Sequence, residues 1–68
     1  MLRRMEVPTA AEIDARREAA GLSRAEMCRL SDTSYSTLTR WIAGATDVRL
    51  GTVRRWIEVI QQAEKGIL

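Results

Sequence analysis

Ten of the eleven basic residues in this 68-residue chain are arginines, and they are unevenly distributed. Residues 21–56 contain six arginines and three acidic residues, whereas residues 1–20 are neutral overall and the last twelve carry a net charge of −1. A planar guanidinium suits bidentate hydrogen bonding to phosphate or to guanine. The central segment therefore offers anion and base recognition, although a GC-rich genome would also favour arginine.

The residue types of the chain do not support catalysis or metal binding. The chain has no histidine and a single cysteine, Cys28, so we expect neither a zinc site nor an intramolecular disulfide bond. Cys28 is expected to pack as a small buried residue. The acidic residues are spaced only as helix caps and surface pairs, so general acid–base catalysis has no candidate group. We therefore expect no enzymatic activity, no cofactor and no metal.

The composition also bears on location. One cysteine is too few for the disulfides that a secreted domain of this size usually needs. Residues 1–8 lack the apolar run of a secretory signal, and no stretch approaches the roughly 18 apolar residues of a membrane span. These features predict a cytoplasmic protein with no membrane contact.

A single helical domain is the architecture that would position the arginines. Sixty-eight residues suit one domain with a small core. Periodicity and turn signals predict a compact all-α fold of four to five helices, with helices near residues 10–20, 24–30, 35–43 and 49–63. The expected organisation is a flexible N-terminal arm at residues 1–8, a domain at residues 9–65 and a short tail at residues 66–68.

Short local motifs predict where these helices begin and end. Residues 9–12 and 23–26 both have the spacing of a capping box, in which two side chains bond each other's backbone amides. Gly21 is expected to supply the left-handed residue after the first helix, and Gly44 is expected to end the third helix.

The polar run at residues 31–34 predicts a tight turn between the second and third helices. Its side chains compete for backbone hydrogen bonds, and Asp32 tolerates a left-handed conformation. Ser34 is then expected to cap the third helix. Two short helices joined by a turn of about four residues have the geometry of a helix-turn-helix.

Residues 13–60 resemble the lambda-repressor-like, Cro-type helix-turn-helix family without a gap. As in that family, Arg17 stands four residues before Gly21, Leu22-Ser23 follows it, and a large–small pair, Met27-Cys28, lies in the second helix. Further matches in the turn and the later helices are Leu30, Ser31, Ser34, Leu38, Gly44, Leu50, Thr52, Val53 and Ile60. The resemblance implies a DNA-binding domain whose third helix enters the major groove, and a structural contact of Arg17 with an acid or a helix end.

Five positions depart from that family's pattern. The usual turn glycine is Asp32, and the usual turn valine is Thr33. The glutamate often found two residues before the closing glycine is Ile42, and the basic or asparagine residues that often flank that glycine are Ala43 and Ala45. These departures weaken the expected phosphate contacts beside the closing glycine more than they affect the fold.

The outer side of the third helix carries the residues expected to contact bases, because a recognition helix presents its N-terminal part to the major groove. They lie opposite Leu38, Trp41 and Ile42, and they are Tyr35, Ser36, Thr37, Thr39 and Arg40. Arg40 is the candidate for bidentate contact with guanine. Phosphate contacts are expected from Arg24, Ser34 and Arg49. The N-termini of the second and third helices favour anions, and the family that the chain resembles usually has a phosphate-contacting glutamine at the position of Arg24. Arg49 lies near the loop that follows the third helix.

Several of these residues have a plainer interpretation. Arg40 and Arg24 are also consistent with solvated side chains on a helix surface, and Tyr35 with a ring that covers the turn instead of touching DNA. Arg54 and Arg55 are expected to cover the exposed face of the fourth helix.

Two apolar stripes run along the predicted fourth helix. One comprises Leu50, Val53, Ile57 and Ile60, and the other comprises Trp56, Val59 and Ala63. Together they cover more than half of the circumference, which is wide for a helix packed on one side. We therefore expect one tryptophan in the core and the other at an interface, unless the monomer buries both.

The second stripe motivates a homodimer. Its expected interface consists of Trp56, Val59, Ala63, Ile67 and Leu68, and the dimer would bind two half-sites ~34–36 Å apart.

The predicted function is sequence-specific binding to double-stranded DNA by a transcriptional regulator, a repressor of phage, plasmid or mobile-element type. The alternative is a protein-interaction module (an antitoxin, inhibitor or adaptor) with the same fold, which the small net charge of +2 and the alanines around Gly44 favour. A DNA architectural or recombination accessory protein would use the same fold. Arg3 and Arg4 in the arm would touch phosphate or a minor groove, or belong to a disordered tail.

Overall fold

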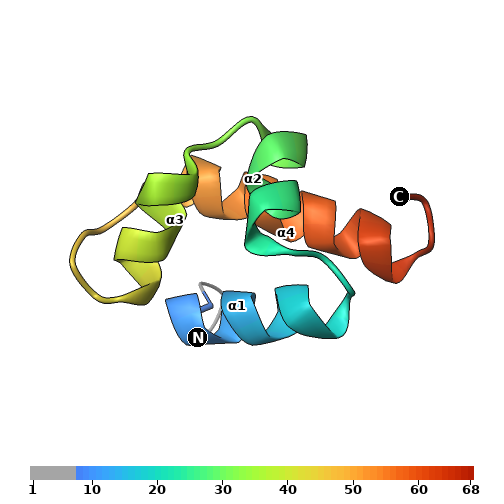
Figure 1. The fold of residues 1–68 in the computed structure, drawn as a ribbon, viewed down its shortest axis with the longest axis horizontal. Helices are drawn as coiled ribbons and strands as arrows, with labels where there is room; N and C mark the ends of the chain where they lie inside the picture. Colours follow the sequence, from blue (N-terminus) through green and yellow to red (C-terminus); the bar gives the residue numbers. More distant parts are fainter. Residues whose placement is uncertain (1–7) are drawn as a thin grey trace, which may run out of the picture.

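The computed structural model describes residues 8–68, which form four helices joined by short connections (Figure 1). The helices are α1 (Ala10–Ala19), α2 (Arg24–Ser31), α3 (Tyr35–Ile42) and α4 (Leu50–Glu64). This confirms the predicted all-α class and the four predicted helices. The predicted arm, with Arg3 and Arg4, lies outside the described residues except for Pro8.

The first two helices begin at the predicted capping boxes. The Thr9 hydroxyl accepts from the Glu12 amide at 3.1 Å, and the Glu12 carboxylate accepts from the Thr9 amide at 2.7 Å. Ser23 and Glu26 repeat this exchange at the start of α2, with both distances 3.0 Å. These boxes satisfy amides that an α-helix leaves without partners, so they stabilise both starts locally.

All four helices end at a residue in the left-handed conformation. Three of these residues are glycines, Gly21, Gly44 and Gly66, and the fourth is Asp32, with φ 57° and ψ 48°. After each helix the amide of the left-handed residue donates to the carbonyl three positions earlier, and the next amide donates to the carbonyl five positions earlier. This pattern is a Schellman motif. The prediction that Asp32 adopts the glycine-like conformation is confirmed.

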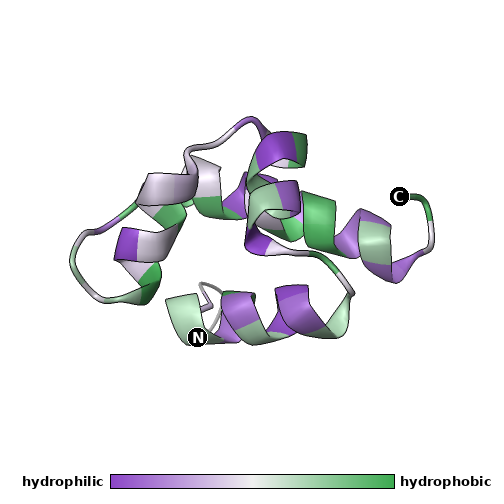
Figure 2. Cartoon of the chain, viewed as in Figure 1, coloured by the Kyte–Doolittle hydropathy of each residue, from purple (hydrophilic) through white to green (hydrophobic). Residues whose placement is uncertain are grey.

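The core lies where α4 meets the other helices. Ile13, Met27, Leu38, Trp56 and Ile60 are completely buried, so every helix contributes at least one side chain. Along α3 and α4 apolar residues alternate with polar ones, as expected for helices with one buried face (Figure 2). Cys28 is also buried, as predicted.

The two stripes of α4 are distributed differently from the prediction. Trp56 and Val59, expected at a dimer interface, are 0% and 6% exposed, whereas Leu50 is 45% exposed. The reason is that α4 packs against both α1 and α2, so the monomer itself covers a wide arc of its surface. Trp56 and Val59 are therefore core residues, and only Ala63, Ile67 and Leu68 of the expected interface remain accessible.

The two tryptophans stack on each other between α3 and α4. Their ring centroids are 5.3 Å apart and the rings are inclined by 26°. Trp56 is fully buried, while Trp41 is half-buried against the core. The stack holds the middle of α4 against the end of α3, which is the helix with the predicted base contacts.

None of the helices found in residues 8–68 is long and apolar enough to cross a membrane.

Candidate nucleic-acid interface

The helix α2, the turn at residues 32–34 and the helix α3 form a helix-turn-helix whose turn is bonded to the core. The indole N–H of Trp56 donates to the hydroxyl of Thr33 at 2.7 Å, across 23 positions of sequence. Thr33 and Ser31 share a hydrogen bond of 2.9 Å between their hydroxyls, and Ser31 donates to the Met27 carbonyl at 2.6 Å. Because Ser31 uses its proton on Met27, Thr33 is the donor between the two hydroxyls.

This chain of hydrogen bonds explains one departure from the family pattern. A valine in place of Thr33 would leave the N–H of a fully buried Trp56 without that acceptor. Buried donors are almost always bonded, because burial removes the water that would otherwise accept from them. Thr33 therefore fixes α4 to the turn, and the turn sets the position of α3 relative to α2.

The outer face of α3 presents polar side chains to solvent. Ser36 and Arg40 lie four residues apart, so they share one face, and both are exposed. Thr37 and Thr39 are half-buried at its edges, and the Thr39 hydroxyl donates to the Ser36 carbonyl at 3.0 Å. Leu38, on the opposite side, is completely buried. The structure thus places the predicted base-contacting residues on the outward side and at the edges of α3.

The N-terminal end of α3 is also accessible. Ser34 caps the helix, its hydroxyl accepting from the Thr37 amide at 3.2 Å, and its own proton stays available to a further acceptor. Tyr35, the first helical residue, is 52% exposed. About half of the Tyr35 side chain is therefore accessible to a ligand at this end of α3, beside the exposed Ser34.

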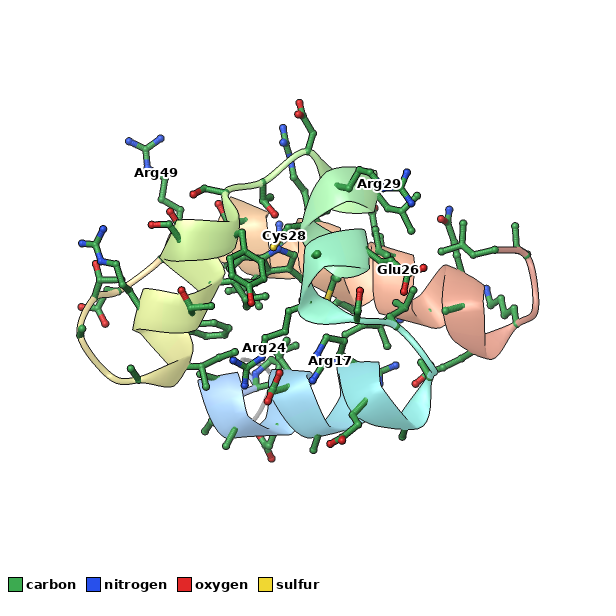
Figure 3. The ribbon with its side chains drawn as sticks, in the orientation of Figure 1. Arg17, Arg24, Glu26, Cys28, Arg29 and Arg49 are labelled. Atoms are coloured by element: carbon green, nitrogen blue, oxygen red, sulfur yellow. The ribbon has the colours of Figure 1, made fainter. Side chains whose placement is uncertain are left out.

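Arg24 opens α2, and an acid of α1 holds its side chain. Its Nε and Nη2 donate to the two carboxylate oxygens of Asp14 at 3.1 and 2.9 Å. Arg17 donates to the same carboxylate through Nε at 3.0 Å, and its Nη1 donates to the Leu22 carbonyl. The predicted structural contact of Arg17 with an acid is therefore confirmed, and its second partner is a carbonyl in the connection between α1 and α2. Figure 3 shows Arg17 and Arg24 side by side above α1.

These contacts perturb the protonation of the cluster. The hydrogen bonds from Arg24, and then those from Arg17, hold the pKa of Asp14 below its ordinary value despite partial burial. The hydrogen bonds of Arg24 with Asp14 likewise raise the pKa of Arg24. Two arginines and one carboxylate leave the cluster with a net charge of +1.

Arg49 lies at the start of α4, after the loop that follows α3. It is exposed, makes no ion pair within residues 8–68, and extends away from the protein (Figure 3). Arg40 is likewise exposed and has no ion-pair partner in the described part of the chain. Both guanidiniums are therefore available to an external anion, whereas Arg24 already has one acidic partner.

Comparison with known protein families identifies the chain. The model of a family described as a helix-turn-helix domain matches residues 10–64, from the start of α1 to the end of α4. The chain therefore belongs to that family, which agrees with its resemblance to Cro-type domains, and such a domain indicates a DNA-binding protein. No curated protein and no solved structure matches the chain.

The sequence did not reveal two residues that organise this interface. Asp14 is ten positions from Arg24, and Thr33 is 23 positions from Trp56. Asp14 and Arg17 have the spacing of a helical ion pair, which indicates a partner for Asp14 within α1. The sequence has no local signal for the contact of Asp14 with Arg24 or for that of Thr33 with Trp56.

Proposed function

We propose that this protein is a sequence-specific regulator of transcription that binds double-stranded DNA with α3 in the major groove. The observation that carries the proposal is the exposed polar face of α3, with Ser36 and Arg40 outward and Leu38 in the core. Because the turn is hydrogen-bonded to Trp56, this face is held rigidly, and rigid placement favours base reading. The protein is proposed to act in the cytoplasm as a repressor of phage, plasmid or mobile-element type, occluding a promoter.

Base and phosphate contacts have different roles in this proposal. Arg40 donates two hydrogen bonds to guanine O6 and N7, while Ser36, Thr37, Thr39 and Tyr35 contact neighbouring base edges and thymine methyl groups. The phosphate contacts come from Arg24, Ser34 and Arg49, the last of which extends freely from the start of α4. Phosphate contacts set the register of the protein on DNA, and base contacts determine the sequence.

The test is a binding measurement with a selected DNA site and a random duplex over a salt series. We expect tight binding to the selected site, with an affinity that falls as salt rises. Arg40→Ala should lower affinity for the selected site roughly 5- to 150-fold and leave the random duplex nearly unchanged. Lys65→Ala removes the same charge at the far end of α4 and should change neither affinity more than about 2-fold.

The outcomes separate the proposed functions. Equal, weak binding to both duplexes would favour an architectural or recombination accessory role. Absence of binding at low salt would favour a protein-interaction module, which the exposed alanines at 43 and 45 support because they offer no phosphate contact beside the closing glycine.

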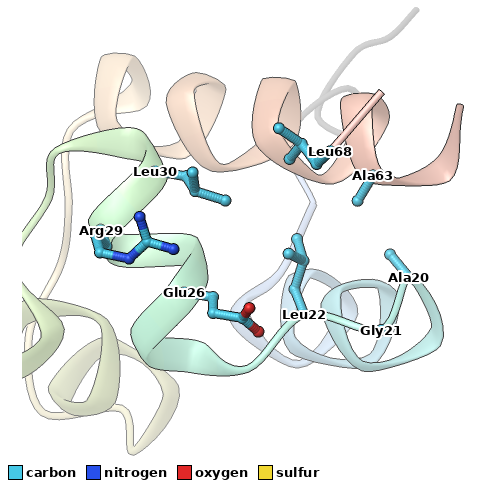
Figure 4. A pocket seen from close by; sticks show the side chains of 8 residues that line it. All are labelled: Ala20, Gly21, Leu22, Glu26, Arg29, Leu30, Ala63 and Leu68. Atoms are coloured by element: carbon cyan, nitrogen blue, oxygen red, sulfur yellow. The ribbon is translucent and has the colours of Figure 1, made fainter. Parts of the chain in front are cut away.

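We further propose that the regulator is a homodimer. A hollow between the end of α1, α2 and the C-terminal residues is lined by Leu22, Leu30, Ala63 and Leu68 (Figure 4). Leu30 and Leu68 are 40% and 53% exposed, and Ile67 beyond them is 67% exposed. Glu26 and Arg29 also line the hollow. In a two-fold symmetric dimer, Glu26 of each copy would pair with Arg29 of the other copy.

Sedimentation equilibrium of the wild type and of Leu30→Glu tests this dimer. We expect a dimeric mass at tens of micromolar for the wild type and a monomeric mass for the variant. A monomeric wild-type mass at that concentration, both with and without DNA, would contradict the proposal.

A further inference from the structure

Asp14 is the acidic centre of a cluster that joins α1 to the start of the helix-turn-helix. Its side chain is only 21% exposed, and both of its oxygens accept from arginines. Arg17, 11% exposed, is anchored by Asp14 on one side and by the Leu22 carbonyl on the other. The carboxylate therefore has a fixed position, because Arg17 is itself held by the Leu22 carbonyl in the connection between α1 and α2.

The way in which Asp14 binds Arg24 leaves part of the guanidinium available. Asp14 occupies the Nε–Nη2 edge, while the Nη1 group makes no hydrogen bond within residues 8–68. The Arg24 side chain is 36% exposed at the N-terminal end of α2, so part of it is accessible to a ligand. A guanidinium has five N–H donors, so it can bind one carboxylate and one phosphate at the same time.

We propose that Asp14 is a positioning residue for DNA binding, holding Arg24 in the orientation in which its free edge binds a DNA phosphate. This inference rests on the proposed function. An arginine side chain loses considerable rotational freedom when it binds, and a side chain already held in place loses less. Arg17 keeps the cluster net positive, so the carboxylate orders Arg24 without removing the attraction for phosphate.

The position of Arg24 also connects this contact with base reading. Arg24 opens α2, and α2 packs against α3 within the helix-turn-helix. A phosphate held by Arg24 would therefore lie on the helix-turn-helix, on the helix next to the one proposed to enter the groove. Through Arg24, an α1 residue sets the register of α3 on DNA.

The matched control is the other ion pair of α1. Arg16 donates from Nε and Nη2 to the two oxygens of Glu64, each at 3.0 Å, and both side chains are well exposed. Asp14→Asn and Glu64→Gln each remove one negative charge and one bidentate pair. Only the first affects Arg24, but it also removes the contact of Arg17 with the same carboxylate. The comparison with the Arg24→Ala background separates the two arginines.

The experiment measures DNA affinity and its salt dependence for both variants, for Arg24→Ala and for the double variant D14N/R24A. Asp14→Asn should lower affinity roughly 3- to 10-fold and flatten the salt dependence, because one phosphate contact is lost. In the R24A background D14N should have no further effect. E64Q should keep the wild-type affinity within about 2-fold.

The opposite results would overturn the inference. An increase in affinity for D14N beyond that of E64Q would mean that Asp14 neutralises Arg24. An equal loss for D14N with and without Arg24 would mean that Asp14 acts on the fold alone. If the wild type binds no duplex, the proposed function fails and this inference fails with it. If the wild type binds and one of the opposite results is found for D14N, only the inference about Asp14 fails.

Folding of each variant is checked by circular dichroism and denaturant titration at the temperature of the binding assay. If D14N does not fold, Arg24→Lys tests the same point, because it keeps the charge and leaves the Asp14–Arg17 pair intact. We expect R24K to lose as much affinity as R24A. Wild-type affinity in R24K would show that a point charge suffices and that positioning has no role.

Discussion

The two connections on either side of α3 are constructed differently. The turn before it, residues 32–34, reaches the core through the hydrogen bonds of Thr33 with Trp56 and Ser31. The loop after it, residues 43–49, has one side-chain hydrogen bond, from Thr46 to the neighbouring Asp47 carbonyl at 3.3 Å. The N-terminal end of α3, which is proposed to enter the groove, is thus held by side-chain hydrogen bonds, whereas its C-terminal end is held by the packing of Trp41 on Trp56. The side-chain hydrogen bonds between the core and this part of the molecule therefore lie beside the end of α3 that is proposed to read bases.

Removing the Thr33 hydroxyl should give the largest loss of stability. Thr33→Val keeps the shape of the side chain but leaves the buried Trp56 N–H without its acceptor, which costs about 1–3 kcal/mol of unfolding free energy. Denaturant titration measures the loss. Thr33→Ser retains the hydroxyl and should recover much of it. Equal stability of T33V and the wild type would mean that the turn is no more firmly bonded than the loop.

Gly44, in the loop after α3, has a backbone conformation that favours glycine. Its φ of 79° is left-handed, and a Cβ there would meet no atom within 4 Å, so Gly44→Ala measures the backbone effect alone. We expect a loss of about 1–2 kcal/mol in unfolding free energy, read from the same titration. Gly44→Asn should lose less, because asparagine tolerates this conformation. A neutral G44A would show that the loop can adopt another conformation.

Asp32 is the counterpart of Gly44 in the turn, with a side chain where the family has glycine. Asp32→Gly should relieve the left-handed strain at φ 57° and raise the unfolding free energy by about 0.4–1 kcal/mol. The midpoint of thermal unfolding should rise accordingly. Asp32→Ala keeps the Cβ and serves as the control, so it should give no such gain. A loss of stability in D32G would mean that the carboxylate contributes more than the strain removes.

Thr46 should give the smallest effect. Its hydrogen bond is long and lies between neighbouring residues at a partly exposed position, so Thr46→Ala should change the unfolding free energy by less than about 0.5 kcal/mol. A change as large as that of T33V, in the same titration, would remove the contrast between the loop and the turn.

The sequence was sufficient for the features that depend on neighbouring residues. The capping boxes at Thr9 and Ser23, the left-handed Asp32 and the cap at Ser34 were all predictable. Each involves groups within about four positions of one another, so the residue types and their spacing largely determine the geometry. The helix-turn-helix itself follows from the same signals, because it consists of two capped helices and the turn between them.

Only the tertiary structure decided which distant groups meet. The α4 stripe containing Trp56 and Val59 faces the core because α1 and α2 both pack on α4, and the helix pattern alone cannot specify the partner of each face. The bond between Thr33 and Trp56 and the ion pair between Asp14 and Arg24 depend on the same packing. The sequence therefore determined the helices and the outer face of α3, while packing between helices determined how firmly that face is held.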